Sequence, residues 1–392
     1  MSPPEKPLNP LAPAPEPETP LGRLRILSST AGVKASPLQL GGMSLGDTWG
    51  RIMGAMTKDE AFALLDAYVA AGGNTIDTAN GYQHETSEIW IGEWMEARGN
   101  RDSIIIATKY SYNYRDYALG KGKAPNAFGN HKKSLHTSLR DSLKKLRTDY
   151  IDILYLHHWD YDSSIQEAMN ALNLVVEQGK VLWLGISDCP AWIVSAANEY
   201  AVGHGKTPFS IYQGRWSVMD RDFERDILPM ARHYGMALAP WGVLGRGRFL
   251  TKAQVEERKN SGDGLRGGMI FGAEQTEKEV KISAALEKVA NELGDYSLTA
   301  VAVAYVMAKA PRVFPIVGGR KLEQLQDNIK GLEIRLSKEQ IKELEDAVPF
   351  DLGFPYNFIG KDPRVEGGRG SVMATMSAFI DWQPAEKPIG YA

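Results

Sequence analysis

Four side chains that can carry charge or move a proton follow apolar runs of the sequence. Asp77 ends the run "NTID", and Tyr82 comes five residues later among small polar residues. Lys109 ends the run "SIIIATK", and His157 ends the run "YIDILYLH". An ammonium group favours the phenolate of a tyrosine, whose ordinary pKa is about 10, and an aspartate keeps that ammonium charged. The acid and the amine would therefore make Tyr82 a proton donor. His157 could orient a substrate carbonyl for reduction by a hydride from the opposite side.

Each of these residues also has a purely structural interpretation. An aspartate at a strand end is often a turn residue, a loop tyrosine is often half-buried, and the lysine and the histidine could belong to the surface and the core. Strand ends carrying Asp, Lys and His would, however, desolvate charge in one place unless the charges paired. A metal hydrolase is disfavoured, because the adjacent residues His157 and His158 point to opposite faces of a strand and no H-x-H or HExxH pattern occurs.

Short β-branched runs alternate with segments of helical periodicity from about Arg25 onward, which indicates a parallel sheet with crossover helices. Several of the runs are almost continuously apolar, as is typical of strands buried on both faces. The predicted strands are Pro37–Met43, Gly73–Thr78, Ser103–Lys109, Tyr150–His157, Val181–Ser187, Phe209–Gln213, Met236–Trp241 and Arg312–Val317.

A helix is predicted after each strand. The clearest one begins at Thr57, which forms a capping-box pattern with Glu60, and ends at Gly72 or Gly73. The others are Ser87–Arg98, His131–Arg147, Ile165–Gly179, Ala191–Tyr200, Asp222–Tyr234, Ser297–Ala310 and Lys321–Leu332, with additional helices at Thr276–Leu293 and Ser337–Ala347. This alternation predicts an α/β fold, a (β/α)8 TIM barrel, whose reactive groups gather where the strands end.

The barrel is expected to span residues 25–350. A flexible arm over residues 1–24, with eight prolines in its first 20 residues, precedes it and lacks the features of a secretory signal. A loop-rich tail over residues 351–392 is expected to pack on the barrel near the substrate pocket.

Composition excludes several classes of function. The net charge of -3 provides no field that would attract nucleic acid or an anionic membrane, and no apolar run approaches the roughly 20 residues of a membrane span. The one cysteine, Cys189, excludes an internal disulfide, so a cytoplasmic protein is predicted. The oligomeric state is left open.

Six segments, in this order and spacing, resemble the aldo-keto reductase superfamily: "GGNTIDTANGY", "SEIWIGEWM", "IIIATK", "DYIDILYLHHWD", "GKVLWLGISD" and "PIVGGRKLEQLQDN". The segments "APWGVLGRGRF", "GISDCPAW", "RDFERDILPM" and "GFPYNF" resemble more narrowly the fungal aryl-alcohol dehydrogenases and their polyketide-reductase relatives. The resemblance implies that Asp77, Tyr82, Lys109 and His157 are catalytic, with the tyrosine as general acid in reduction and general base in oxidation. The spacing of the motif selects His157 over His158.

The resemblance also implies an NADP(H) cofactor extended across the barrel mouth, and no good G-x-G-x-x-G fingerprint of a Rossmann domain occurs. Trp241 matches the aromatic residue that stacks on the nicotinamide, and the basic pair Arg320 and Lys321 favours NADPH over NADH. Asp188 stands where most of the superfamily has asparagine, and an ionised aspartate cannot donate to the carboxamide oxygen. The implied cofactor-binding residues are Gly42, Met43, Ser187, Asp188, Gln213, Trp241, Leu244, Gly245, Arg246, Arg248, Arg320, Lys321, Gln324, Asp327 and Asn328.

The loops expected around the substrate are rich in aromatic residues, which suits a flat ring. The predicted pocket residues are Trp49, Tyr110, Tyr112, Tyr114, Trp159, Trp216 and Phe358. Glycines in the loop 110–130 could let it act as a lid.

The predicted reaction is the NADPH-dependent, reversible reduction of aromatic aldehydes to aryl alcohols, without a metal. Two alternatives stay open: a ketone reductase of polyketide or mycotoxin biosynthesis, and a regulatory module that senses NADP(H) without catalysis. In such modules the histidine is usually replaced, so the presence of His157 favours an enzyme.

Overall fold

The computed structural model describes residues 11–261, 272, 274–294 and 296–391, and over these ranges an eight-stranded parallel sheet forms its centre. The strand order is β10-β3-β4-β5-β6-β7-β8-β9. The strands are β3 (Gln39–Gly41), β4 (Thr75–Asp77), β5 (Ile105–Tyr110), β6 (Ile151–Leu156), β7 (Val181–Ser187), β8 (Phe209–Arg215), β9 (Ala237–Trp241) and β10 (Ile316–Val317).

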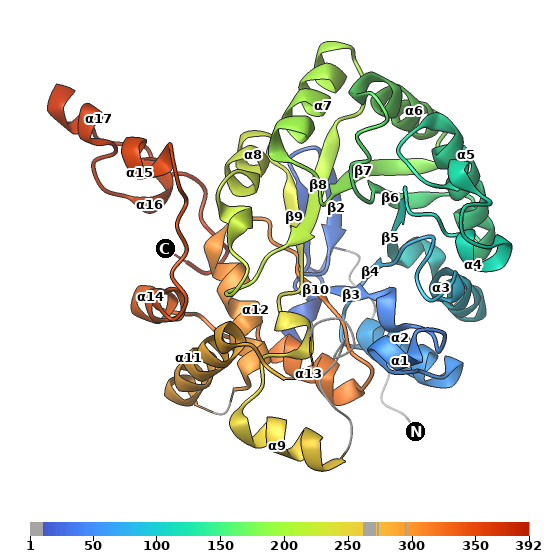
Figure 1. Cartoon of the computed structure of the whole chain (residues 1–392), viewed down its shortest axis with the longest axis horizontal. Coiled ribbons are helices and arrows are strands. Elements are labelled where there is room, and N and C mark those ends of the chain that lie inside the picture. Colours follow the sequence, from blue (N-terminus) through green and yellow to red (C-terminus); the bar gives the residue numbers. More distant parts are fainter. Residues whose placement is uncertain (1–10, 262–271, 273, 295, 392) are drawn as a thin grey trace.

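Hydrogen bonds between the segments of β9 and β10 close this sheet into a barrel (Figure 1). The amide of Leu238 donates to the Arg312 carbonyl at 2.9 Å, and the amide of Phe314 donates to the Leu238 carbonyl at 2.8 Å. The predicted TIM barrel is therefore confirmed. The eighth strand is shorter than predicted, because Arg312 has a φ of +54° and Pro315 has no amide hydrogen to donate.

Helices cover the outside of the barrel (Figure 1). Those that follow the strands are α2 (Lys58–Ala70), α3 (Thr86–Arg98), α5 (Lys132–Lys145), α6 (Ile165–Glu177), α7 (Ala191–Gly203), α8 (Ile227–His233), α12 (Leu298–Lys309) and α13 (Leu322–Lys330). The predicted additional helices are α11 (Glu277–Leu293) and α14 (Lys338–Asp346), and short helices in the loops are α1 (Gly50–Met53), α4 (Asp116–Leu119) and α9 (Lys252–Ser261).

Local signals in the sequence account for several of these boundaries. Thr57 and Glu60 form the predicted capping box at the start of α2, in which each side chain accepts from the backbone amide of the other residue. The predicted helix Asp222–Tyr234 is instead divided into a 3-10 turn, η5 (Asp222–Glu224), and α8. The division falls at Asp226, whose φ of -127° is not helical.

An amino-terminal hairpin of β1 (Arg25–Ser28) and β2 (Ala31–Ala35), which the sequence did not indicate, closes one end of the barrel. Its buried side chains pack with residues of the barrel interior. The amide of Ser29 donates to the carbonyl of Gly235, just before β9, at 3.1 Å. Because the hairpin covers the ends where the strands begin, the opposite end is left for a functional site.

The predicted flexible arm is corrected in part. Residues 1–10 lie outside the described residues, but the end of the arm is anchored, since Leu21 is completely buried and the Thr19 hydroxyl donates to the Ala71 carbonyl at 2.6 Å. In the described ranges no helix has the length and apolarity needed to cross a bilayer.

The carboxy-terminal tail is joined to the barrel at the start of α8. Arg225 donates to the Leu352 carbonyl at 2.9 Å, and the Tyr356 hydroxyl donates to Asp226 at 2.9 Å. The short helices α15 (Tyr356–Ile359), α16 (Pro363–Glu366) and α17 (Val372–Ser377) then lie outside α8, away from the barrel (Figure 1).

Candidate active site

A buried ion pair lies where β4 and β5 end. The Lys109 ammonium donates to a carboxylate oxygen of Asp77 at 2.6 Å and to the Thr78 carbonyl at 2.7 Å. Lys109 is 0% exposed and Asp77 is 3% exposed. Both side chains face the barrel interior, because Asp77 pairs with Ala107 in the sheet and Lys109 lies two residues further along the same face.

The second carboxylate oxygen of Asp77 is bonded across the barrel. Gln213, on β8, donates its amide nitrogen to this oxygen at 2.8 Å. The carboxylate therefore has a partner on each oxygen, which offsets the cost of its burial. Gln213 was predicted to contact a cofactor, and in this structure its amide nitrogen is bonded to Asp77.

Tyr82 and His157 complete the predicted group of four. The Lys109 ammonium lies 5.0 Å from the centre of the Tyr82 ring, and the rings of Tyr82 and His157 lie 5.9 Å apart at 75°. Lys145, on α5, supports the loop that carries the tyrosine, because its ammonium donates to the Asn80 carbonyl at 2.9 Å.

The surroundings determine the charge of each member. Burial raises the pKa of Tyr82, and the Lys109 ammonium only partly offsets this, so the phenol is protonated at neutral pH. Burial lowers the pKa of Lys109, but the contacts with Asp77 and Tyr82 outweigh this effect. The pKa is therefore raised above its ordinary value, and the ammonium stays charged. Burial and the Lys109 charge hold the pKa of His157 well below its ordinary value, so its ring is neutral. A phenol that can donate a proton thus lies between a fixed cation and a neutral imidazole.

Glycines allow close packing and a tight turn beside this group. A Cβ at Gly42 would lie 3.0 Å from both the Asp77 carbonyl and the Ser87 hydroxyl, so the backbone after β3 packs closely against the end of β4 and the start of α3. In the turn after β9, Gly245, Arg246 and Gly247 all have positive φ, of +58°, +58° and +79°, which turns their backbone in a tight curve.

Trp241, at the end of β9, is held by a carboxylate. Its indole nitrogen donates to both oxygens of Asp188 at 3.3 Å each, and the Ser187 hydroxyl lies 3.4 Å from the same group. Burial raises the pKa of Asp188. Asp188 therefore serves to orient the indole ring.

Two predicted cofactor residues are engaged elsewhere, which corrects those predictions. Arg248 is 0% exposed, and its guanidinium is paired with Glu279 of α11 at 2.6 Å. The carboxylate of Asp327 accepts from the hydroxyls of Ser297 and Thr299 at the start of α12. Arg248 thus joins the segment after β9 to α11, and Asp327 joins α13 to the start of α12.

The remaining predicted cofactor residues differ in their exposure. Arg320 and Lys321 are exposed at the start of α13, where their amides donate to the Gln324 side chain. Met43 is 40% exposed, whereas Asn328 is buried. Leu244 immediately precedes the turn at residues 245–247.

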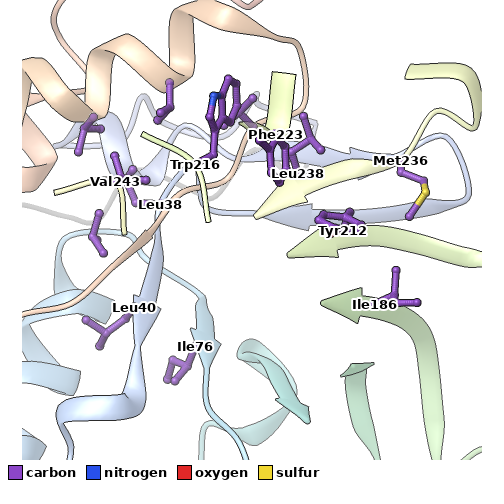
Figure 2. Close-up of a cluster of buried hydrophobic side chains, with 14 of the residues drawn as sticks. Leu38, Leu40, Ile76, Ile186, Tyr212, Trp216, Phe223, Met236, Leu238 and Val243 are labelled. Carbon is purple, nitrogen blue, oxygen red and sulfur yellow. The ribbon is translucent and has the colours of Figure 1, made fainter. Parts of the chain in front are cut away.

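Several predicted pocket residues are buried in the core. Tyr110 is 0% exposed and donates to the Asn130 carbonyl, because as the neighbour of Lys109 it points to the helix side of β5. Trp216 is also 0% exposed and stacks on Phe223 at 5.1 Å (Figure 2). The Tyr114 hydroxyl donates to Asp141 at 2.6 Å.

Phe358 is not part of the pocket either. It is 63% exposed on α15, in the tail outside α8. Trp159 is half-buried and packs against the core. Of the predicted pocket residues, Trp49 and Tyr112 lie by the tyrosine loop: the Trp49 ring is 6.3 Å from the Tyr82 ring, and the Tyr112 ring covers Gly81.

Two further aromatic residues, which the sequence analysis did not identify, continue the row of rings beyond Trp49. The ring of His84 lies 5.9 Å from that of Trp49 and stacks on Tyr117 at 3.8 Å and 10°. Tyr117 belongs to the loop that was predicted to act as a lid. His84 follows Tyr82 by two residues, and that proximity was the one signal that could have identified it.

The barrel carries four polar side chains at its open end. Comparison of the sequence with known proteins identifies the family to which such a barrel belongs. The model of the aldo/keto reductase family matches residues 37–349, so the chain belongs to this family. It is 62% identical over 368 residues to a Saccharomyces cerevisiae protein named "Putative aryl-alcohol dehydrogenase", covering 94% of this chain and 97% of that one.

Two further relatives carry more specific names. The aryl-alcohol dehydrogenase [NADP(+)] of Phanerodontia chrysosporium is 53% identical over 386 residues, covering 97% of this chain and 99% of that one. The norsolorinic acid reductase of Aspergillus flavus is 51% identical over 350 residues, covering 89% and 87%. The predictions of the family and of an NADP-dependent oxidoreductase are therefore confirmed.

The residues present fit such a cofactor. Buried Gly42, the curved backbone of residues 245–247 and the indole of Trp241, held by Asp188, lie at the same end of the barrel as the four polar side chains. The exposed basic residues at the start of α13 suit a phosphate.

The correction for Arg248 leads to the first prediction. We expect Arg248→Met to lower the free energy of unfolding by about 3–5 kcal/mol, because Glu279 would be left buried without its partner. The Kd for NADPH should change less than about twofold, because this guanidinium is buried and paired with Glu279. Urea denaturation and NADPH fluorescence titration measure the two quantities. Arg320→Met is the control, and it should raise the Kd for NADPH with little loss of stability. A large rise in Kd for Arg248→Met would instead support a role of Arg248 in binding the cofactor.

Proposed function

We propose that this chain catalyses the NADPH-dependent reduction of aromatic aldehydes to aryl alcohols, with Tyr82 as the proton donor. The observation that carries the proposal is the buried Lys109–Asp77 pair at 2.6 Å, with its ammonium 5.0 Å from the ring of a protonated tyrosine. A location in the cytoplasm stays a prediction.

The four polar residues would divide the work in the direction of reduction. Tyr82 gives its proton to the carbonyl oxygen as that oxygen gains negative charge. The Lys109 ammonium stabilises the phenolate that results, and Asp77 keeps this ammonium charged and in place. The neutral ring of His157 orients the carbonyl oxygen toward the phenol. Solvent then returns a proton to Tyr82.

The cofactor would be held along the barrel mouth by residues of this chain. Trp241, fixed by Asp188, would support the nicotinamide ring, and the curved backbone of residues 245–247 would bind the pyrophosphate. Arg320 and Lys321 would bind the 2′-phosphate. The bound NADPH supplies the hydride that becomes the new C–H bond of the alcohol.

The aromatic residues beside Tyr82 support an aromatic substrate. The Trp49 ring lies next to the proposed proton donor, and the His84 ring lies next to Trp49. Each aromatic contact with a substrate would contribute about 0.5–1.5 kcal/mol beyond the burial of its area. The relative named norsolorinic acid reductase supports the alternative of an aromatic ketone as substrate.

The second prediction tests substrate and cofactor together. We expect kcat/KM with NADPH to be about 10–100-fold higher than with NADH, because charged hydrogen bonds to the 2′-phosphate contribute about 1.5–3 kcal/mol. Initial rates with a methoxylated benzaldehyde, with hexanal and with an aromatic polyketide ketone measure the substrate preference, and the benzaldehyde should react fastest.

Each result of this panel has a distinct meaning. Faster turnover of the ketone would favour the alternative substrate class. NADPH binding by fluorescence titration without turnover of any carbonyl would contradict the proposed function.

A further inference from the structure

Gln83 is the residue next to the proposed proton donor, and the chemistry above does not use it. Its side chain is completely buried, yet it does not serve its own loop. Its amide oxygen accepts from the backbone amide of Trp49 at 2.8 Å, and its amide nitrogen donates to the Met43 carbonyl at 3.0 Å. Its backbone carbonyl accepts from the Thr48 hydroxyl at 3.3 Å. Gln83 thus connects the loop after β4 to the loop after β3.

The loop after β3 is shaped around this side chain. Gly46 has a φ of +153°, and a Cβ there would lie 2.6 Å from the Cβ of Gln83 and 2.7 Å from its Cγ. The two loops therefore approach so closely that only glycine fits opposite Gln83. A displacement of the glutamine would move the segment that carries Trp49.

The backbone around Gln83 is held in an unusual conformation. Gln83, His84 and Glu85 have φ values of +53°, +50° and +79°, which are rarely adopted by residues other than glycine. Consecutive residues keep such angles only where their surroundings impose them. Gln83, the first of the three, is held by its bonds to the neighbouring loop.

The rings of these two loops, together with one ring from the loop after β5, form a continuous row, which we call the aromatic wall: Trp49, His84 and Tyr117. Trp49 meets the edge of the Tyr82 ring at 6.3 Å, His84 meets Trp49 at 5.9 Å, and Tyr117 stacks on His84 at 3.8 Å. Trp49 reaches this row from the loop after β3, and His84 reaches it from the loop after β4.

We propose that Gln83 is a positioning residue that holds the aromatic wall beside Tyr82 and thereby gives the enzyme its preference for aromatic over aliphatic aldehydes. The inference rests on the proposed function. Gln83 does not touch the reacting atoms. It acts through Trp49, whose backbone amide it binds, and through His84, which follows it in the chain.

The third prediction is that Gln83→Leu lowers the ratio of kcat/KM for a benzaldehyde to kcat/KM for hexanal by about tenfold, because displacements of about 1 Å near a reacting group are costly. Leucine has a similar size but cannot bond to either backbone group. The change should appear mainly as a higher KM for the benzaldehyde, with the Kd for NADPH little altered. Gln83→Glu, which keeps the acceptor for the Trp49 amide, should recover part of the ratio. Gln178→Leu is the matched control, since Gln178 is exposed at the end of α6.

A double-mutant cycle separates positioning from general destabilisation. Trp49→Leu should lower the ratio by itself, and adding Gln83→Leu to it should lower the ratio little further, because both changes remove the same wall. An unchanged ratio in Gln83→Leu, or its full effect in the Trp49→Leu background, would overturn the inference while the proposed function stands. A wild-type protein that reduces hexanal but not benzaldehydes would overturn both.

Discussion

Tyr82→Phe is expected to lower kcat for a benzaldehyde by about 10²–10⁴-fold, the usual contribution of a positioned general acid. The substitution removes one oxygen and keeps the ring between Trp49 and His157, so the packing of the site should persist. Single-turnover kinetics with bound NADPH measure the chemical step directly. The Kd for NADPH, from fluorescence titration, should be unaltered.

Tyr110→Phe is the matched control for this variant. Tyr110 lies one residue from Lys109, but its hydroxyl donates to the Asn130 carbonyl on the outer side of β5. We expect its loss to cost about 0.5–1.5 kcal/mol of stability and to leave kcat nearly unchanged. If Tyr82→Phe kept the wild-type kcat, or if Tyr110→Phe lost it, the assignment of the proton donor would be wrong.

The pKa of Tyr82 also predicts how the two directions respond to pH. Burial raises this pKa above its usual value of about 10, and Lys109 lowers it in part. Reduction needs the protonated phenol, so its rate should be flat through neutral pH and fall in alkaline solution. Oxidation of the alcohol needs the phenolate, so its rate should rise as the pH approaches that pKa. His157, which is already neutral, should add no further transition near pH 7.

Lys109→Met should lower both activity and stability. Asp77 would remain buried and charged, with Gln213 as its remaining charge-stabilising contact among those described, and breaking such a pair costs about 3–5 kcal/mol. The rate should fall by at least about 10²-fold, because the phenolate of Tyr82 would lose its neighbouring cation. Urea denaturation and steady-state rates measure the two effects.

The double variant Lys109→Met with Asp77→Asn separates these effects. It removes both charges, so it should regain much of the lost stability while it stays inactive. Wild-type stability should also fall as the pH rises through the folded-state pKa of Lys109, which lies above its unfolded value, and the double variant should lack this loss. Recovery of activity along with stability would show that the lysine has only a structural role.

The local sequence accounts for much of the fold and of the proposed catalytic group. Nearly continuous apolar runs predict the strands. The alternation of side chains along a strand then accounts for the position of Lys109 inside the barrel. The same alternation predicts that Tyr110 points outward, toward the helices. Its prediction as a pocket residue rested instead on the aromatic composition of its loop. Trp216 was misassigned for the same reason, since an aromatic residue near a strand end can serve the core as well as a pocket.

The residues of the sequence by themselves determined the order of strands and helices, the family, and the set Asp77, Tyr82, Lys109 and His157, because periodicity and motif spacing are local properties of the chain. Only the tertiary structure decided which partner each charged or polar side chain meets. Arg248 pairs with Glu279 across 31 residues, and Gln213 reaches Asp77 across 136 residues. Such pairings depend on how distant segments close in space, as does the bond from Gln83 into the neighbouring loop, and no local pattern specifies them.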